Sequence, residues 1–331
     1  MNPKKNQSGK QGFTGRVRAV RLGIFGLLLL LVPLNAGASE LQLGTGEAGS
    51  FSHFSGRLLC RILAASLPDV TCKVQAAADE IDNLTNLQNG SMDLALVDAK
   101  SLYNAVTKSG VFRFVGIGYD NLAVLTPLYD LPVSIIVRRD AGIATLDDLK
   151  NKRVNGGALG SYQRQTMEMI MQAKGWKVTD FEVFQELPSS HAQDTMVFCH
   201  GTVQAMIGVG VHPNPTVQRL LENCNAGLLA VVDPDIDKLV AASPYLWSTE
   251  IRADSYPPPS NRVKTFGTRV VLAASADMDD QLAEAIVKAL YENKKRLQGG
   301  HPALTLYAPE EAAKGVAKVA LHPGAARFLS Q

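Results

Sequence analysis

The sequence predicts an α/β protein built as two lobes with a ligand-binding cleft between them. Two segments repeat the same order of strand, glycine-rich loop and helix, one with its loop at Gly44 and the other at Gly156. The 331 residues suffice for about two domains, and a hydrophobic content of 46% is typical of a globular protein. In open α/β sheets, ligands bind beyond the carboxyl ends of strands, where such loops meet helix N-termini. The repeated unit therefore predicts a site between the lobes.

The first 38 residues predict an export signal. Six basic side chains and no acidic one precede the apolar run Leu22–Leu34, and Ala36-Gly-Ala38 follows this run. A helix of that length reaches only about 20 Å, whereas a bilayer core is about 30 Å thick. We expect cleavage after Ala38 and a soluble periplasmic protein; an uncleaved membrane anchor is the alternative.

The charge of the remaining chain is mildly acidic. Without residues 1–38, 27 basic side chains face 31 acidic ones. This balance offers no electrostatic basis for binding nucleic acid or an anionic membrane, so we expect neither as a partner.

The mature chain begins with the order of elements typical of a parallel sheet. Hydrophobic runs predict strands at 40–43, 70–74 and 93–97, and helical patterns lie at 58–63 and 83–89. Strand, helix, strand, helix and strand in this order indicate flanking helices on a parallel sheet.

The later part of the chain shows further strands and helices. Thr145-Leu-Asp-Asp148 resembles a capping box with aspartate in place of glutamate. Pro257-Pro-Pro259 lies in a predicted loop, residues 254–261. The patterns predict strands at 133–138, 154, 203–209, 228–232 and 268–274, and helices at 162–173 and 278–297.

Four cysteines are expected to form disulfides once the chain is exported. Three pairings are possible. We favour Cys60–Cys72 and Cys199–Cys224, whose loops of 11 and 24 residues would each stabilise the fold by about 3 kcal/mol. Four buried free thiols are the alternative. Neither the cysteines nor the six scattered histidines have the spacing of a metal site, so we expect no metal.

Both glycine-rich loops predict anion sites. Glycine lets the backbone approach a ligand closely, and the N–H groups at a helix start favour an anion. In the second loop, Ser161 is placed to cap the helix and Arg164 to reach a bound carboxylate. Tight turns with ordinary caps are the alternative for both loops.

The first loop also has the form of a dinucleotide fingerprint, Gly44-x-Gly46-x-x-Gly49. A dinucleotide site needs an acidic residue at the end of the second strand, where this chain has Gln75-Ala-Ala77. We therefore expect no nicotinamide cofactor. No nucleophile elbow of the form G-x-S-x-G occurs, so we expect no enzymatic activity.

The order and spacing of several motifs resemble the TAXI-type solute receptors of TRAP transporters. The resemblance covers about residues 40–331, and its most specific stretch is Gly160-Ser-Tyr-Gln-Arg164 with Thr166-Met-Glu168 and Ala173-Lys-Gly-Trp176. The other motifs are Leu43-Gly-Thr-Gly46, Leu59-Cys60, Gly142-Ile-Ala-Thr-Leu-Asp-Asp-Leu-Lys150, Lys152-Arg-Val154, His212-Pro-Asn214, Cys224, Ile236-Asp-Lys-Leu239 and Leu321-His-Pro-Gly-Ala325.

The resemblance implies a two-lobed periplasmic binding protein of type II, in which the chain crosses twice between the lobes. On this basis lobe I comprises residues 39–139 and 265–331, and lobe II comprises residues 140–264. The implied role is to capture a small carboxylate such as glutamate or 2-oxoglutarate and deliver it to a membrane permease, and we expect the receptor to be a monomer. The family positions of Cys60, Cys199 and Cys224 also support the favoured pairing.

The resemblance also suggests the binding residues. We expect the carboxylate to be held by Ser161, Gln163 and Arg164. From the other lobe we expect Thr45, Gly46 and Ser50 to close on the ligand.

This chain departs from many relatives at Asp98-Ala-Lys100, where they have glutamine, serine and aspartate. It also has Tyr162 and Val211 where they have glycine. If Asp98 faces the cleft, it would pair with an ammonium or hydroxyl group, so an amino acid would fit better than a plain dicarboxylate. A periplasmic sensor component and an exported α/β hydrolase are the alternative functions.

Overall fold

The structure is a computed structural model that describes residues 39–187, 191–258, 261–312, 316 and 319–331. All of these belong to one compact unit. The predicted signal peptide, residues 1–38, and its cleavage point after Ala38 lie outside the described residues. Within the described ranges, no helix combines the length and apolar character needed to cross a membrane.

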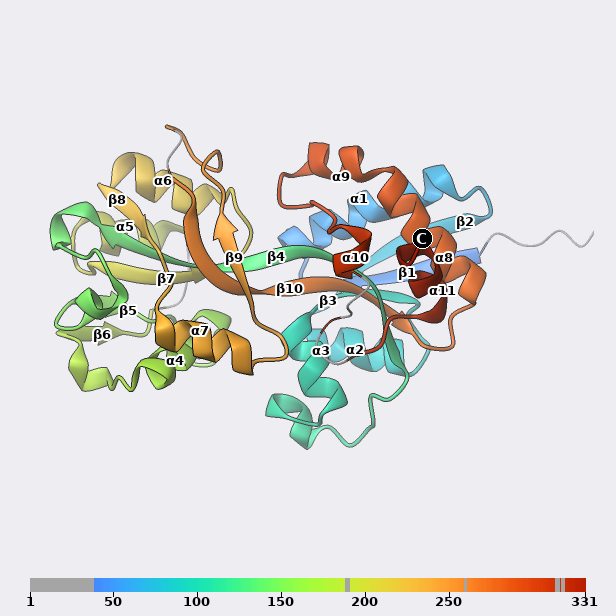
Figure 1. Cartoon of the computed structure of the whole chain (residues 1–331), viewed down its shortest axis with the longest axis horizontal. Coiled ribbons are helices and arrows are strands. Elements are labelled where there is room, and N and C mark those ends of the chain that lie inside the picture. Colours follow the sequence, from blue (N-terminus) through green and yellow to red (C-terminus); the bar gives the residue numbers. More distant parts are fainter. Residues whose placement is uncertain (1–38, 188–190, 259–260, 313–315, 317–318) are drawn as a thin grey trace, which may run out of the picture. The chain divides into compact units, whose positions relative to one another are not determined.

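The elements alternate between strands and helices along the chain (Figure 1). The strands are β1 (Ser39–Thr45), β2 (Val70–Ala76), β3 (Leu94–Asp98), β4 (Leu122–Arg138), β5 (Arg153–Asn155), β6 (Val183–Gln185), β7 (Ala205–Val209), β8 (Ala226–Leu229), β9 (Trp247–Ile251) and β10 (Val263–Ser275). The α-helices are α1 (Phe51–Ser66), α2 (Glu80–Gln88), α3 (Ala99–Val106), α4 (Tyr162–Lys174), α5 (His191–Cys199), α6 (Pro215–Asn223), α7 (Pro234–Ala242), α8 (Asp280–Glu292), α9 (Lys294–Gly300), α10 (Pro309–Ala312) and α11 (Pro323–Leu329). Short 3₁₀ helices are η1 (Gly110–Phe114), η2 (Arg139–Ala141), η3 (Leu146–Leu149) and η4 (Val178–Asp180).

Two sheet regions share the long strand β4, and each region is the centre of one lobe. In lobe I the strand order is β2-β1-β3-β10-β4, and in lobe II it is β4-β7-β5-β6, with β8 beside β4. β9 pairs with the first part of β10, Val263–Gly267. β1 runs parallel to β2 and β3, as the predicted order of elements requires. β4 pairs with β10 up to Pro132 and with β7 from Val133 onward. The chain thus passes between the lobes within a single strand.

The structure corrects three of the expected elements. The strand predicted at 133–138 is the last part of β4, which begins at Leu122. The strand predicted at 228–232 runs over 226–229 as β8, and the helix predicted at 278–297 is divided at Asn293 into α8 and α9.

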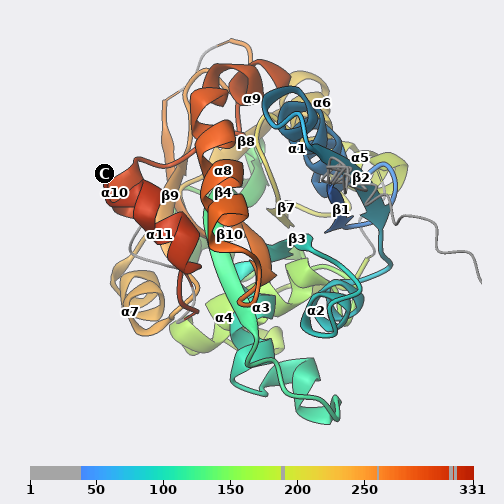
Figure 2. The ribbon, with the colours of Figure 1, turned by 90° about the vertical axis from the view of Figure 1, so that its right-hand side faces the viewer.

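Helices cover both faces of each sheet region (Figures 1 and 2), and a hydrophobic core lies between the helices and the sheet on each face. In lobe I, α1, α8 and α11 pack on one face and α2 and α3 on the other. In lobe II, α4 and α7 pack on one face and α5 and α6 on the other. Helices on both faces of a sheet are the arrangement expected of a doubly wound α/β lobe.

The favoured disulfide pairing is confirmed. Cys60 in α1 is bonded to Cys72 in β2, and their Cα atoms are 5.0 Å apart. Cys199 at the end of α5 is bonded to Cys224 at the end of α6, with Cα atoms 4.6 Å apart. Each bond therefore joins segments of one lobe that are close in the sequence, 12 residues apart in the first case and 25 in the second.

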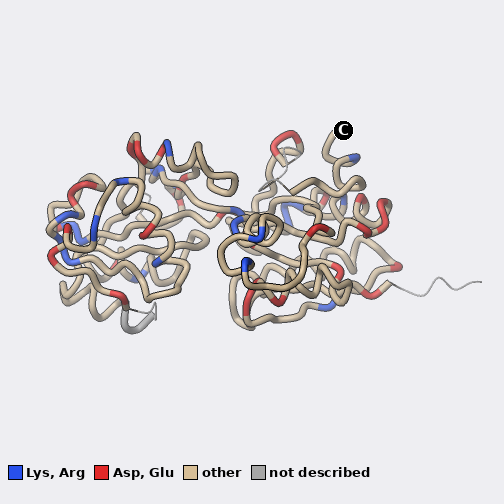
Figure 3. Tube along the Cα trace, turned by 90° about the horizontal axis from the view of Figure 1, so that it is seen from below, with Lys and Arg blue, Asp and Glu red and all other residues tan. Residues whose placement is uncertain are grey.

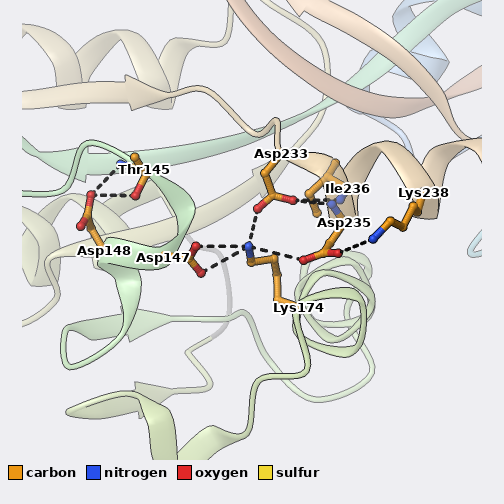
Figure 4. A network of polar contacts seen from close by, with 8 residues as sticks. All are labelled: Thr145, Asp147, Asp148, Lys174, Asp233, Asp235, Ile236 and Lys238. Atoms are coloured by element: carbon orange, nitrogen blue, oxygen red, sulfur yellow. Dashed lines mark hydrogen bonds and ion pairs between the residues drawn. The ribbon is translucent and has the colours of Figure 1, made fainter.

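A buried lysine joins α4 to α7 in lobe II (Figure 4). The Lys174 Nζ lies 2.5 Å from Asp233, 3.3 Å from Asp147 and 3.9 Å from Asp235, while its side chain is only 8% exposed. Burial opposes its charge, but the aspartates outweigh this cost and raise the pKa of Lys174.

The expected capping box from Thr145 to Asp148 is confirmed at the start of η3.

Charged residues are mixed in sign over both lobes. Figure 3 shows acidic and basic positions scattered over both lobes. This pattern is consistent with the mildly acidic balance of the mature sequence.

Candidate functional site

A cavity lies where the loops of lobe I meet the segment that follows β7 in lobe II. We call it the cleft cavity, and it has a volume of about 270 Å³. Lobe I contributes the start of α1, the start of α2, and residues of β3, β4 and β10, while lobe II contributes Gly210, Val211 and Asn214. The lining residues are Gly46, Phe51, Ser52, Glu80, Leu96, Tyr129, Leu131, Gly210, Val211, Asn214 and Val270.

A second cavity, which we call the side cavity, adjoins the first within lobe II. Its volume is about 170 Å³, and it shares Gly210, Val211 and Asn214 with the cleft cavity. Gln163, from the first turn of α4, also lines it. The two cavities thus share the segment 210–214 as part of their walls.

The first glycine-rich loop brings the start of α1 to the cleft cavity. A side chain at Gly44 would place its Cβ 2.2 Å from the Met92 sulfur, so glycine is required for the close packing of β1. The chain then turns into α1, where the Ser50 hydroxyl accepts a hydrogen bond from the His53 N–H at 3.1 Å. The N–H groups of Phe51 and Ser52 lie in the first turn, where no helical carbonyl can accept them. Both residues line the cavity.

The second glycine-rich loop has the same construction at the start of α4. Gly157 has a φ of +89°, and a Cβ there would lie 2.8 Å from that of Gln163. The Ser161 hydroxyl accepts a hydrogen bond from the Arg164 N–H at 3.1 Å, so the predicted cap is confirmed. The loop thereby sets Gln163 beside the side cavity.

Four side chains connect the two lobes beside these cavities. The Tyr162 hydroxyl of lobe II donates to the Asp98 carboxylate of lobe I at 3.2 Å. The Lys100 ammonium donates to the Gln165 side chain at 2.6 Å and lies 5.0 Å from the centre of the Tyr162 ring. Asp98, Lys100 and Tyr162 are positions at which this chain departs from the TAXI pattern. The structure therefore gathers these departures into one contact between the lobes.

Two acidic side chains lie close together on the lobe I side of this contact. Asp98 is 5% exposed, and its own N–H donates to the Glu80 carboxylate at 2.8 Å. Burial, followed by the proximity of Glu80, raises the pKa of Asp98 to about 7. Burial also raises the pKa of Glu80, despite hydrogen bonds from Ser101 and Asp98 that oppose this shift. Glu80 lines the cleft cavity, so this pair makes its wall acidic.

The structure places the predicted binding residues in different settings. Gly46 lines the cleft cavity and Gln163 the side cavity. Ser50 and Ser161 cap the two helices, and Asp98 bridges the lobes as described above. Thr45 is fully buried, and its hydroxyl contacts the Gln75 carbonyl and the His53 ring at 3.0 Å each.

Arg164 is turned toward its own lobe. Its guanidinium donates to Glu168 at 2.7 Å and to Glu186 at 2.5 Å, and it packs over the Phe184 ring at 4.8 Å. Burial opposes the charge of the guanidinium, but the two carboxylates outweigh this effect and raise the pKa of Arg164. In this conformation the predicted carboxylate-binding arginine is already paired.

The sequence reasoning missed most residues that line the cleft cavity. Ser52 and Glu80 each lie in the first turn of a helix that follows a strand. Their position relative to the strand ends is a signal that could have identified them. Tyr129 and Leu131 were missed because they lie in the part of β4 that was not predicted. Val211 was noted only as a departure from the TAXI pattern.

Solved structures share this fold at low sequence identity. A TctC solute-binding protein from Polaromonas, determined with no ligand, matches with a TM-score of 0.58 at 15% identity, over 82% of this chain and 90% of that chain. The protein XAC2383 from Xanthomonas citri, determined bound to ATP, matches with a TM-score of 0.50 at 12% identity, over 88% of this chain and 94% of that chain. The predicted class, a two-lobed α/β fold of the periplasmic binding protein kind, is thereby confirmed.

The sequence itself assigns the family. The chain belongs to the NMT1-like family, whose sequence model matches residues 43–330. This match covers nearly all of residues 39–331, including both glycine-rich loops and every residue that lines the two cavities.

Proposed function

We propose that the mature chain is a periplasmic solute-binding receptor of the TAXI type that serves a TRAP transporter. It captures a small carboxylate, best an amino acid, between its lobes and delivers the ligand as a monomer to a membrane permease. The observation that carries this proposal is the cleft cavity, which is lined by the first turn of α1 and by Glu80, with Asp98 directly behind Glu80.

The first part of the recognition is the carboxylate of the ligand. The N–H groups of Phe51 and Ser52 offer donors at the positive end of the α1 dipole. Gln163 supplies a neutral donor and acceptor from the other lobe through the adjoining side cavity. Gly46 keeps the wall of the cleft cavity free of a side chain.

The second part is the ammonium group. Glu80 lies in the cavity wall with Asp98 immediately behind it. An ammonium placed there favours the ionised forms of both acids and compensates their burial. The role expected of Asp98 from the sequence is thus shared in this proposal: Glu80 contacts the ammonium, and Asp98 adds its charge from behind.

The proposed set of residues also includes Thr45, Ser50, Ser161 and Arg164, in supporting roles. The hydroxyl bonds of Thr45 and the caps of Ser50 and Ser161 fix the two loops. Arg164 reaches a ligand only by leaving Glu168 and Glu186, so we expect its replacement to weaken lobe II more than ligand binding.

Calorimetric titration of refolded residues 39–331 tests this proposal. The panel is neutral and acidic amino acids together with 2-oxoglutarate and succinate. We expect one compound to bind at a single site, and Gln163→Ala to weaken it about tenfold. Gln172→Ala, at the exposed far end of α4, is the control and should leave the affinity unchanged. A folded protein that binds none of these compounds would refute the proposal.

A further inference from the structure

We infer that the cleft cavity selects amino acids with uncharged, apolar side chains and discriminates against dicarboxylates. This inference rests on the proposed receptor function and makes its ligand class narrower. It follows from which side chains line the cavity and from how the neighbouring charged groups are already used.

The walls of the cleft cavity are mostly hydrocarbon. Phe51, Leu96, Leu131, Val211 and Val270 line it from both lobes. Leu96, Val211 and Val270 are buried side chains, and the Phe51 ring is held edge-on against Tyr129 at 5.1 Å. A pocket of this kind binds a branched or aromatic group through apolar contact, with a few polar groups setting its orientation. The volume of about 270 Å³ suits a small ligand.

The cavity offers no basic side chain to a second carboxylate. Within the described part of the chain, neither Lys nor Arg lines the cleft cavity or the side cavity. His212, which lines the side cavity, hydrogen-bonds with the Tyr256 hydroxyl, and burial lowers its pKa to about 4, so it is neutral at pH 7.

The basic groups near the contact between the lobes are already engaged. Lys100 donates to Gln165, and Arg164 is paired with Glu168 and Glu186. Arg164 could bind a ligand carboxylate only by leaving these two partners, and Lys100 lines neither of the two cavities. Glu80 in the cavity wall, with Asp98 behind it, offers a second carboxylate no positive charge.

One carboxylate can be accommodated, because the start of α1 provides N–H donors without a cation. The α-carboxylate of an amino acid uses this position, and its ammonium uses Glu80. The side chain then faces the hydrocarbon wall. Glutamate would bury its second charge against that wall, and 2-oxoglutarate would in addition lack the ammonium.

The decisive experiment compares four probes on the intact mature protein by calorimetry: L-leucine, L-phenylalanine, L-glutamate and 4-methyl-2-oxopentanoate. The last is the keto analogue of leucine, so it has the same branched group without the ammonium. We expect leucine or phenylalanine to bind about tenfold or more tightly than both glutamate and the keto acid.

The variant Glu80→Gln tests the ammonium position separately. Its amide oxygen can still accept the Asp98 N–H, so the fold of this region should be preserved. We expect Glu80→Gln to lower the affinity for leucine and to leave the affinity for the keto acid unchanged. The preference of the protein for leucine over the keto acid should therefore become smaller. Asp82→Asn is the matched control, since Asp82 lies exposed in the same first turn of α2.

The outcomes separate this inference from the proposed function. If glutamate binds as tightly as the best neutral amino acid, or if the keto acid matches leucine, the inference is wrong while a carboxylate receptor remains. If none of the amino acids and acids binds to the folded protein, the proposed function fails, and the inference fails with it.

Discussion

Asp98 is the residue at which the local structure, the lobe contact and the proposed site meet. Its carboxylate caps α3 by accepting the Lys100 N–H at 2.7 Å and also accepts the hydroxyls of Tyr162 and Thr268. These donors favour the ionised form, but burial and the nearby Glu80 outweigh them. A side chain in this balance changes its charge near neutral pH.

Ligand affinity should therefore depend on pH. The pKa of Asp98 is raised to about 7, so the carboxylate is neutral below that pH and its attraction for an ammonium is lost there. We expect the affinity for an amino acid to fall as pH decreases from about 8 to about 5, and binding near neutral pH to release protons. Titration in buffers of different ionisation enthalpy measures the protons released.

The variant Asp98→Asn provides the control for this dependence. It should bind with a smaller change across the same pH range and release fewer protons, because one titrating group is gone. An unchanged pH profile in this variant would show that Asp98 does not govern the interaction.

At the scale of single residues, sequence reasoning predicted local roles such as helix caps better than contacts between residues far apart in the sequence. It placed Ser161 correctly as a cap because a cap depends on neighbours within three residues. It assigned Arg164 to a ligand and did not anticipate the pairing of Arg164 with Glu186. Glu186 is 22 positions away and comes beside Arg164 through the pairing of β5 with β6. Contacts of this kind depend on tertiary structure, which a local pattern does not contain.

At the scale of elements, the part of the fold with clear hydrophobic periodicity was predicted and the part interrupted by proline was not. The β1–α1–β2–α2–β3 order follows directly from alternating hydrophobic runs. In β4, Pro127 and Pro132 argue against a central strand. The structure accommodates Pro127 at an irregularity in the pairing of β4 with β10, next to Val271.

The ion-pair network between α4 and α7 gives a prediction at this scale. Lys174→Met should lower the free energy of unfolding by about 2 kcal/mol, because it leaves Asp233 partly buried without its cation. Lys238→Met is the matched control. Lys238 contacts Asp235 at 3.1 Å, but its side chain is 77% exposed, so the change should be within about 0.5 kcal/mol.

Urea unfolding of both variants measures these two differences. Equal effects of the two substitutions would mean that the network adds nothing beyond ordinary surface pairs.

At the scale of the whole molecule, β4 and β10 connect the lobes and are the natural axis for any closure around a ligand. β10 accepts the Val231 N–H of lobe II at the Lys264 carbonyl and pairs with β3 of lobe I further along. Both strands run between the lobes without an intervening loop (Figure 1). The cleft cavity lies beside them, which is where closure would enclose a ligand.

Export of the whole chain gives a second prediction at this scale. Expressed at full length in a Gram-negative host, the protein should be recovered from the periplasm with Ser39 as its first residue. Intact-mass spectrometry of the periplasmic fraction measures this. Recovery of the uncleaved chain in the membrane fraction would instead identify residues 22–34 as an anchor.

A crystal structure of residues 39–331 with the tightest amino acid of the panel tests the central claim most directly. We predict the ligand in the cleft cavity, with its carboxylate at the start of α1 and its ammonium on Glu80. A different cavity, of about 260 Å³, lies between β9 and the segment 302–307, where it is lined by Arg252 and Tyr307. A ligand bound there, with the cleft cavity empty, would contradict the account.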